Sequence, residues 1–225
     1  MQSMNLFAYE VSIWLIPVLL AITFHEAAHG LVAHWLGDDT AWNLGRVSFN
    51  PLVHVDPFGT VLLPGLLLAS GAPFLFGYAK PVPVKFAALR HPRRDMMLVA
   101  AAGPLMNLLL AIIAALAIHL VPLVPGMAAE WLARNLQNAL VLNVVLMVFN
   151  LLPIPPLDGG RIITGLLPRR LAVPFASIER FGMLPLLALI FLLPMLGAEF
   201  DVVARVIGRS TEFVLRIILH LTANV

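Results

Sequence analysis

The chain has 225 residues, of which 60% are hydrophobic and 12% are charged. Globular domains carry roughly 45–50% apolar residues and about 25% charged ones, and a soluble fold of this size could not bury so much apolar surface. These numbers exclude a water-soluble globular protein and indicate an integral membrane protein. The net charge is only +2, which suits membrane orientation by short basic loops rather than nucleic-acid binding. Cysteine is absent, so disulfide and thiolate chemistry are excluded.

Long segments without charges predict helices that cross the bilayer, because a span needs about 20 apolar residues and an unpaired charge at its centre is costly. The first apolar stretch runs from about residue 11 to residue 36 and is interrupted only by three histidines and one glutamate. Further charge-free segments lie between residues 56 and 80, 95 and 130, 134 and 158, and 180 and 199. We predict an all-α polytopic membrane protein with four to six transmembrane helices.

Two segments do not have the pattern of an ordinary span. Residues 58–79 contain two prolines and four glycines, which favours a re-entrant segment or hairpin packed against protein. In residues 202–221 the charges recur at steps of four, three and four, so they share one helical face. That face carries Arg205, Arg209, Glu212 and Arg216, and the opposite one Val206, Phe213, Ile217 and Leu221. This pattern predicts an interfacial amphipathic helix in preference to a sixth span.

The distribution of loop charge predicts the orientation of the chain. Residues 80–95 carry five basic side chains against one acidic one, and residues 161–180 carry four against one. The intervening loop near residues 123–134 is balanced. By the positive-inside rule both basic loops are cytoplasmic and the balanced loop lies outside. With no internal repeat or flexible linker, residues 1–225 are expected to form a single membrane-embedded domain.

The sequence His25-Glu26-Ala27-Ala28-His29 reads H-E-x-x-H within an apolar helix. The spacing of four residues points both imidazoles to the same side of the helix, where they can share one Zn²⁺ ion. Glu26 lies beside them and can take a proton from the attacking water and pass it to the leaving amine. A chance match is common in soluble helices, but two histidines and a glutamate in hydrocarbon require a compensating partner. We therefore predict a zinc site here.

A zinc site of this type needs a third protein ligand, and Asp158 is the best candidate. It follows the segment 150–157, N-L-L-P-I-P-P-L, whose three prolines must end the preceding helix. Gly159 and Gly160 are expected to let the chain turn sharply after the carboxylate. The alternative is an ordinary helix end at the membrane surface, with Asp158 simply solvated.

Together these two motifs resemble the site-2 protease family, the intramembrane zinc metalloproteases. Three further segments are similar to compact bacterial members of that family, in the expected order. They are Gly103-Pro104-Leu105-Met106-Asn107, the stretch from Gly45 to Thr60 and the stretch from Ala79 to Val84. The resemblance covers about residues 10–165, the expected catalytic core, and residues 170–225 are expected to form peripheral helices. There is no room for a PDZ or CBS domain.

The resemblance implies that His25, His29 and Asp158 are the zinc ligands, with one Zn²⁺ per chain, and that Glu26 is the general base. Asn150 occupies the position of a family asparagine that stabilises the oxyanion or holds the substrate backbone, although a hydrogen bond between helices would explain it equally well. Asn107 is expected to support packing or substrate alignment. Five other histidines lack a companion at ligand spacing and are expected on the surface or in packing: His34, His54, His91, His119 and His220.

The resemblance implies an intramembrane zinc endopeptidase that hydrolyses peptide bonds within or near transmembrane helices of membrane-protein substrates, in a bacterial or archaeal cell membrane. Because Asp158 ends its helix on the cytoplasmic side, the active site faces the cytoplasm and the first helix runs from outside to inside. Residues 37–57 then share the cytoplasmic side with residues 80–95, so residues 58–79 must enter and leave on one face. The alternatives are a metal transporter or sensor with the same His/His/Asp cluster, and an inactive scaffold of the same fold.

Overall fold

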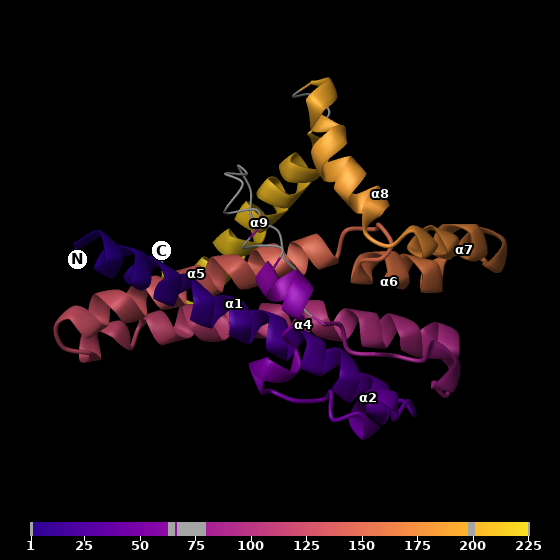
Figure 1. Cartoon of the computed structure of the whole chain (residues 1–225), viewed down its shortest axis with the longest axis horizontal. Coiled ribbons are helices and arrows are strands. Elements are labelled where there is room, and N and C mark those ends of the chain that lie inside the picture. Colours follow the sequence, from indigo (N-terminus) through magenta and orange to yellow (C-terminus); the bar gives the residue numbers. More distant parts are fainter. Residues whose placement is uncertain (1, 63–65, 67–79, 198–200, 225) are drawn as a thin grey trace.

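The computed structural model describes residues 2–62, 66, 80–197 and 201–224 (Figure 1). Within these residues every regular element is helical, which confirms the all-α prediction. The helices are α1 (Gln2–Trp35), α2 (Thr40–Asn43), α4 (Pro92–Ile118), α5 (Met127–Asn150), α6 (Asp158–Leu166), α7 (Arg169–Ala176), α8 (Leu184–Leu187) and α9 (Val202–Leu221). Short 3₁₀ or π turns lie at Pro51–Val53, Pro57–Leu62, Phe86–Ala88, Val121–Leu123, Ser177–Phe181, Ala188–Leu192 and Pro194–Leu196.

Three of the described helices are long and apolar enough to cross a bilayer, namely α4, α5 and the part of α1 from Ala8 to Trp35. With 27 residues, α4 is about 40 Å long, against a hydrocarbon core of about 30 Å. A fourth span results if Arg169–Phe181 and Leu184–Ile190, which meet at an angle of 82°, count as one broken span. With the broken span included, the described residues contain four spans, the lower end of the predicted four to six. Most of residues 58–79 lies outside the described residues, so the re-entrant segment stays a prediction.

Helices α1 and α5 run in the same direction, with α4 antiparallel to both (Figure 1). Near their N-terminal ends, Trp131 Nε1 donates to Ser12 Oγ at 2.9 Å and Asn138 Nδ2 donates to the carbonyl of Ile13 at 3.0 Å. At the start of α4, the buried carboxylate of Asp95 accepts the backbone N–H of His91, the residue before the helix, at 2.8 Å. This hydrogen bond runs from the first turn of the helix back to its N-cap residue, as in a capping box. Because α4 runs antiparallel to α1 and α5, its N-terminal end lies at the same end of the bundle as their C-terminal ends.

The two loops expected on the same side of the membrane contact each other at that end. The backbone N–H of Arg90 donates to the carbonyl of Leu36 at 3.0 Å, and that of Lys85 donates to Asp38 Oδ2 at 2.6 Å. Burial acts to raise the pKa of Asp38, but hydrogen bonds from Thr40 and Lys85 outweigh it and hold that pKa below its usual value. Asp38 is therefore an anionic anchor between the end of α1 and residues 80–85. Residues 37–57 and 80–95 thus share one end of the bundle, as expected.

Helix α9 packs along α4 and α5 and does not meet the requirements of a span, as the amphipathic pattern predicted. Its four charged side chains are exposed. However, Val206, Phe213, Ile217 and Leu221 are also exposed and do not form the packing face. At 100° per residue, the packing stripe lies beside that apolar face. It contains Ile207, Val214 and Ile218 in the core cluster with α4 and α5, and the buried Val203.

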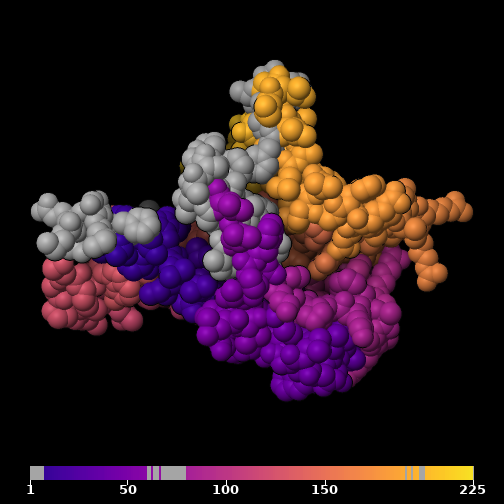
Figure 2. Space-filling model, viewed as in Figure 1, coloured from indigo at the N-terminus to yellow at the C-terminus, as the bar shows by residue number. Residues whose placement is uncertain are grey.

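The surface shows how the remaining elements are arranged around the bundle. In Figure 2 the residues from about 40 to 60, in purple, cover one side of the bundle beside the start of α4. The elements from α7 to α8, in orange, stand out from the body of the molecule. Gly182, with φ of +57°, lies at the bend between these elements, where a left-handed backbone favours glycine.

Candidate metal centre

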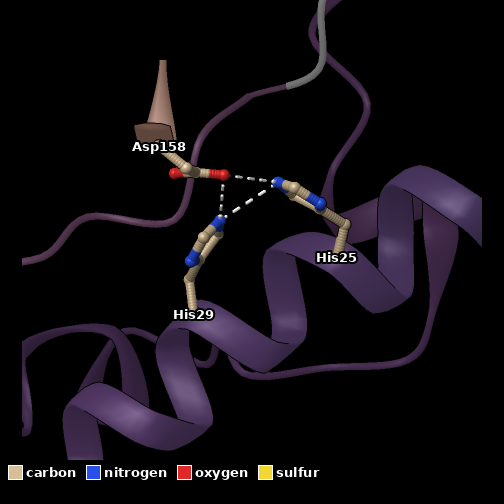
Figure 3. Close-up of side chains that lie close together, drawn as sticks. All are labelled: His25, His29 and Asp158. Atoms are coloured by element: carbon tan, nitrogen blue, oxygen red, sulfur yellow. Dashed lines mark hydrogen bonds and ion pairs between the residues drawn. The ribbon is translucent and has the colours of Figure 1, made fainter. Parts of the chain in front are cut away.

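The H-E-x-x-H histidines and Asp158 converge at one point inside the protein (Figure 3). His25 and His29 come from α1, and Asp158 is the first residue of α6. The two Nε2 atoms are 3.0 Å apart, and each lies 3.3 Å from Asp158 Oδ2. All three residues are buried, with exposed fractions of 5–8%. Among the described residues, they are the one group of His, Asp or Glu whose ligand atoms are close enough to share a metal ion.

The hydrogen bonds around the two imidazoles determine where their lone pairs point. His29 Nδ1 donates to the carbonyl of Val99 at 2.7 Å, and His25 Nδ1 donates to Asn107 Oδ1 at 2.5 Å. A neutral imidazole that donates through Nδ1 presents a lone pair at Nε2. Asp158 Oδ2 is buried and accepts no hydrogen bond from any residue that the structure describes. With both imidazoles neutral, three electron-pair donors therefore face one another, which is the donor set that a Zn²⁺ ion requires.

A chain of amide groups fixes the tautomer of His25. Asn143 Nδ2 donates to the carbonyl of Ala139 at 2.8 Å, which leaves its Oδ1 to accept Asn107 Nδ2 at 2.9 Å. Asn107 must then turn its own Oδ1 towards His25. Because a backbone carbonyl can only accept, the order of donors is set along the whole chain. Asn107 is fully buried behind His25, so its contacts are those of a packing residue that orients an imidazole.

Replacing Asn107 with leucine is expected to weaken zinc binding by about 10–100-fold, the usual effect of losing a partner that orients a metal-binding histidine. Competition with a chelating dye on detergent-purified protein measures this affinity. Asn138→Leu is the matched control, since it also removes an amide hydrogen bond between helices but lies away from the centre. Equal zinc affinity in the two variants would contradict the role assigned to Asn107.

Gly103 allows α4 to approach the two histidines. A Cβ atom at this position would lie 2.4 Å from His29 Nε2 and 2.6 Å from His25 Nε2. Non-bonded atoms essentially never come this close to a real Cβ atom, and both nitrogens belong to the group that could hold a metal ion. The glycine is therefore required by the close packing of α4 against α1 at the metal centre.

The substitution Gly103→Ala is expected to abolish stoichiometric zinc binding, because the added methyl group occupies the space between the ligand atoms. Metal analysis of the purified variant tests this expectation. Gly208→Ala on α9 is the control, because a Cβ atom there meets nothing within 4 Å. Wild-type zinc content in Gly103→Ala would show that this space is not used by the metal.

Asp158 reaches the centre because α5 stops at Asn150 and residues 151–157 form an irregular loop before α6. The prolines of this segment end the helix as expected. The carboxylate does not end a helix, however, since it begins α6, and Gly159 and Gly160 are helical rather than part of a sharp turn. A Cβ atom at Gly159 would lie 2.2 Å from the carbonyl oxygen of Leu151, and one at Gly160 would lie 2.5 Å from Pro155 N. The two glycines are thus explained by the segment 151–155 packing directly on α6.

A cavity of about 630 Å³ opens beside the three residues. Glu26 and Asn150 both line it. Glu26 Oε2 accepts the backbone N–H of Val82 at 2.7 Å, and Asn150 Nδ2 donates to the carbonyl of Leu146 on its own helix at 3.0 Å. The cavity therefore brings a carboxylate, an amide and the three ligand atoms to one space.

Arg161 is the only lysine or arginine among the described residues that line this cavity. Its Nε and Nη2 atoms donate to Glu179 Oε1 at 3.1 and 2.7 Å, and its guanidinium carbon lies 5.5 Å from the centre of the Phe86 ring. The side chain thus connects α6 to residues on two other segments. It lies one helical turn after Asp158, so it fixes the first turns of α6 against the neighbouring segments.

The other histidines make contacts away from the centre. His34 pairs with Asp39 at 2.5 Å and stacks on Trp42. His54 Nε2 donates to the carbonyl of Ser48 at 2.8 Å. His91 lies 3.8 Å from Asp95, and His119 contacts the carbonyl of Thr222. His220 is exposed near the end of α9. The surface and packing roles expected for these residues agree with their positions.

The sequence did not indicate three groups that shape the centre, namely the carbonyl of Val99, Asn143 and the backbone N–H of Val82. It indicated Gly103 only as part of a family motif, without a role. Gly103 and Asn107 are four residues apart and therefore share one face of α4, a signal that the spacing itself contained. The other three are backbone groups or a residue on another helix, so only the folded chain shows them.

The fold and the centre define a class, a helical membrane protein with a buried His/His/Asp group that could hold a metal ion and an adjacent glutamate. The model of peptidase family M50 matches residues 118–193. YwhC of Bacillus subtilis (strain 168), an inferred zinc metalloprotease, is 39% identical over 200 residues, which cover 83% of this chain and 86% of that protein. Rip2 of Mycobacterium tuberculosis (strain H37Rv), also an inferred zinc metalloprotease, is 31% identical over 196 residues, which cover 87% and 71%. No solved structure matches the chain significantly.

The chain therefore belongs to peptidase family M50, the site-2 proteases, and is a membrane-embedded zinc metalloendopeptidase. The family model extends to residue 193, so the resemblance does not stop near residue 165 as expected. The added part of the match contains Glu179, the partner of Arg161 at the cavity.

Proposed function

We propose that the protein hydrolyses peptide bonds within or near the transmembrane helices of membrane-protein substrates, as in regulated intramembrane proteolysis. One zinc ion per chain is held by His25, His29 and Asp158. The observation that carries the proposal is the convergence of these three buried ligand atoms beside a cavity lined by Glu26. Zinc bound there supplies Lewis acidity for the scissile carbonyl and makes water a better nucleophile at neutral pH.

The residues around the zinc site have distinct tasks in this reaction. Glu26 takes the proton of the attacking water and later gives it to the leaving amine. Asn150 lines the same cavity and offers its side-chain amide to the carbonyl oxygen on which negative charge develops. The two acceptors at Nδ1, the carbonyl of Val99 and Asn107 Oδ1, keep both imidazoles facing the reaction centre.

The substrate must unwind before it can be cut. A transmembrane helix hides its carbonyls in its own hydrogen bonds, so the segment at the scissile bond has to become extended. The non-helical backbone of residues 151–157, or the segment 58–79, is the proposed partner for the extended substrate strand.

The active site is proposed to face the cytoplasm, in a bacterial or archaeal cell membrane. The two basic regions near residues 80–95 and 161–180 give this orientation by the positive-inside rule. Single cysteines placed at exposed positions 42 and 94 should therefore react with an impermeant maleimide only after the cells are opened, while one at 127 should react in intact cells. The opposite pattern would reverse the orientation.

One experiment in liposomes distinguishes proteolysis from zinc transport. Purified protein with zinc should cleave a single-span peptide, and removal of zinc by a chelator should stop cleavage. A metal transporter with the same ligands would instead move zinc across the liposome membrane without cutting the peptide, and an inactive scaffold would do neither. Zinc transport without zinc-dependent cleavage would overturn the proposal.

A further inference from the structure

The segment formed by residues 80–85, here called the strap, runs alongside α1 without regular secondary structure. Its central residue, Val82, is buried, with 8% of its surface exposed. The backbone N–H of Val82 donates to Glu26 Oε2 at 2.7 Å, across 56 positions of sequence. The strap therefore directly contacts the carboxylate to which the proposed function gives the role of general base.

The sequence of the strap isolates this single donor. Pro81 and Pro83 flank Val82, and proline has no backbone N–H. Val82 thus provides the only amide donor between residues 81 and 83. A residue before proline is also confined to extended conformations, so Pro83 limits the direction in which the Val82 amide can point. The proline–valine–proline pattern presents one donor from a stiff backbone.

Contacts on each side of Val82 fix the strap in place. Arg46 Nη2 donates to the carbonyls of Lys80 and Pro81 at 2.7 and 3.4 Å. The N–H of Lys80 donates to the carbonyl of His54 at 2.9 Å, and the far end of the strap is anchored at Asp38.

Close packing against α1 sets the depth of Val82. A Cβ atom at Gly30 would lie 3.0 Å from Val82 Cγ1, so the valine side chain lies directly on the helix that carries Glu26. Gly30 follows His29 in the sequence, which places this contact next to the metal centre. The strap therefore cannot move away from Glu26 without losing contacts along its whole length.

We propose that the backbone N–H of Val82 is a positioning group for Glu26, and that Arg46 is a positioning residue for the strap. A charge-assisted hydrogen bond to Oε2 holds one carboxylate oxygen and leaves Oε1 directed to the proton of the attacking water. Glutamate is a long side chain with several rotatable bonds, so without this donor the base spends less time in the reactive geometry. The inference rests on the proposed proteolytic function.

The test compares two substitutions at one position. Val82→Pro removes the N–H at a position that Pro83 already restricts to extended conformations, while Val82→Ala retains the N–H and removes part of the side chain. For Val82→Pro we expect kcat to fall by about 10²-fold, the effect of a misplaced catalytic group, with KM and zinc content unchanged. Val82→Ala keeps the donor but loses the packing of the side chain on Gly30, so its kcat should fall by less than that of Val82→Pro. Arg46→Gln, which releases the two strap carbonyls, should lower kcat in the same way at unchanged zinc content.

A second readout does not depend on proteolysis. In protein labelled with ¹⁵N-valine, the Val82 amide signal is assigned by its absence in Val82→Ala, and a donor to a carboxylate should resonate at low field. Glu26→Gln replaces the anionic acceptor and should shift this signal upfield. Unchanged kcat in Val82→Pro, or an amide signal that does not respond to Glu26→Gln, would overturn the proposal. If the wild type cleaves no substrate, the proposed function fails, whereas the amide signal still shows whether Val82 contacts Glu26.

Discussion

Replacing Glu26 with glutamine should abolish detectable proteolysis and leave zinc bound. The amide has the shape of the carboxylate but cannot accept the proton of the attacking water, and general-base assistance is worth about 10²–10⁴-fold in rate. Because Glu26 is not one of the three converging ligands, the metal centre should remain intact. The measurement is the rate of peptide cleavage together with the zinc content of the same sample.

The matched control for this variant is Glu10→Gln, an exposed glutamate on the same helix, which should cleave at the wild-type rate. A transporter or sensor that used the His/His/Asp cluster would tolerate Glu26→Gln, since none of its ligands changes. Cleavage by Glu26→Gln at close to the wild-type rate would therefore remove the proposed mechanism and favour that alternative.

Asp158→Ala should lose most of the zinc that the wild type binds at close to one ion per chain. A site with three protein ligands that loses one of them, and with it the only negative charge among them, is a weak site. The two neutral imidazoles of α1 should not hold zinc through purification. Elemental analysis of detergent-purified protein gives the ratio of zinc to chain directly.

An exposed aspartate provides the comparison for Asp158. Asp39 lies outside the centre, where it pairs with His34, so Asp39→Ala should keep its zinc. The folded state of both variants is checked by circular dichroism and by their elution from a sizing column. Full zinc content in folded Asp158→Ala would exclude Asp158 as a ligand.

The features of the site that depend on residues close together in the sequence were predictable. His25 and His29 share a helical face at a spacing of four, and the prolines after Asn150 end α5 where expected. Asp158 was found because a carboxylate beside three prolines and two glycines has few ordinary uses in an apolar segment. In each case the residues that support the prediction lie within about a dozen consecutive positions.

The rest depends on contacts between distant segments. Gly159 and Gly160 were predicted to form a turn, whereas they are helical and make room for the backbone of residues 151–155. The face of α9 that packs on the bundle could not be predicted, because the hydrophobic pattern does not distinguish a lipid-facing stripe from a protein-facing one. The Val82 donor could not be foreseen, since nothing in the strap indicates which carboxylate its amide will reach.

Intramembrane proteolysis is defined by the place at which the substrate is cut, so the cleavage site is best mapped in a bilayer. Wild-type protein and a single-span substrate are reconstituted together in liposomes with zinc, and the products are identified by mass spectrometry. We expect a cut within or at the edge of the hydrophobic segment of the substrate, and no cut in the presence of Glu26→Gln protein. Cleavage only in the water-exposed tails of the substrate, far from the membrane segment, would contradict it.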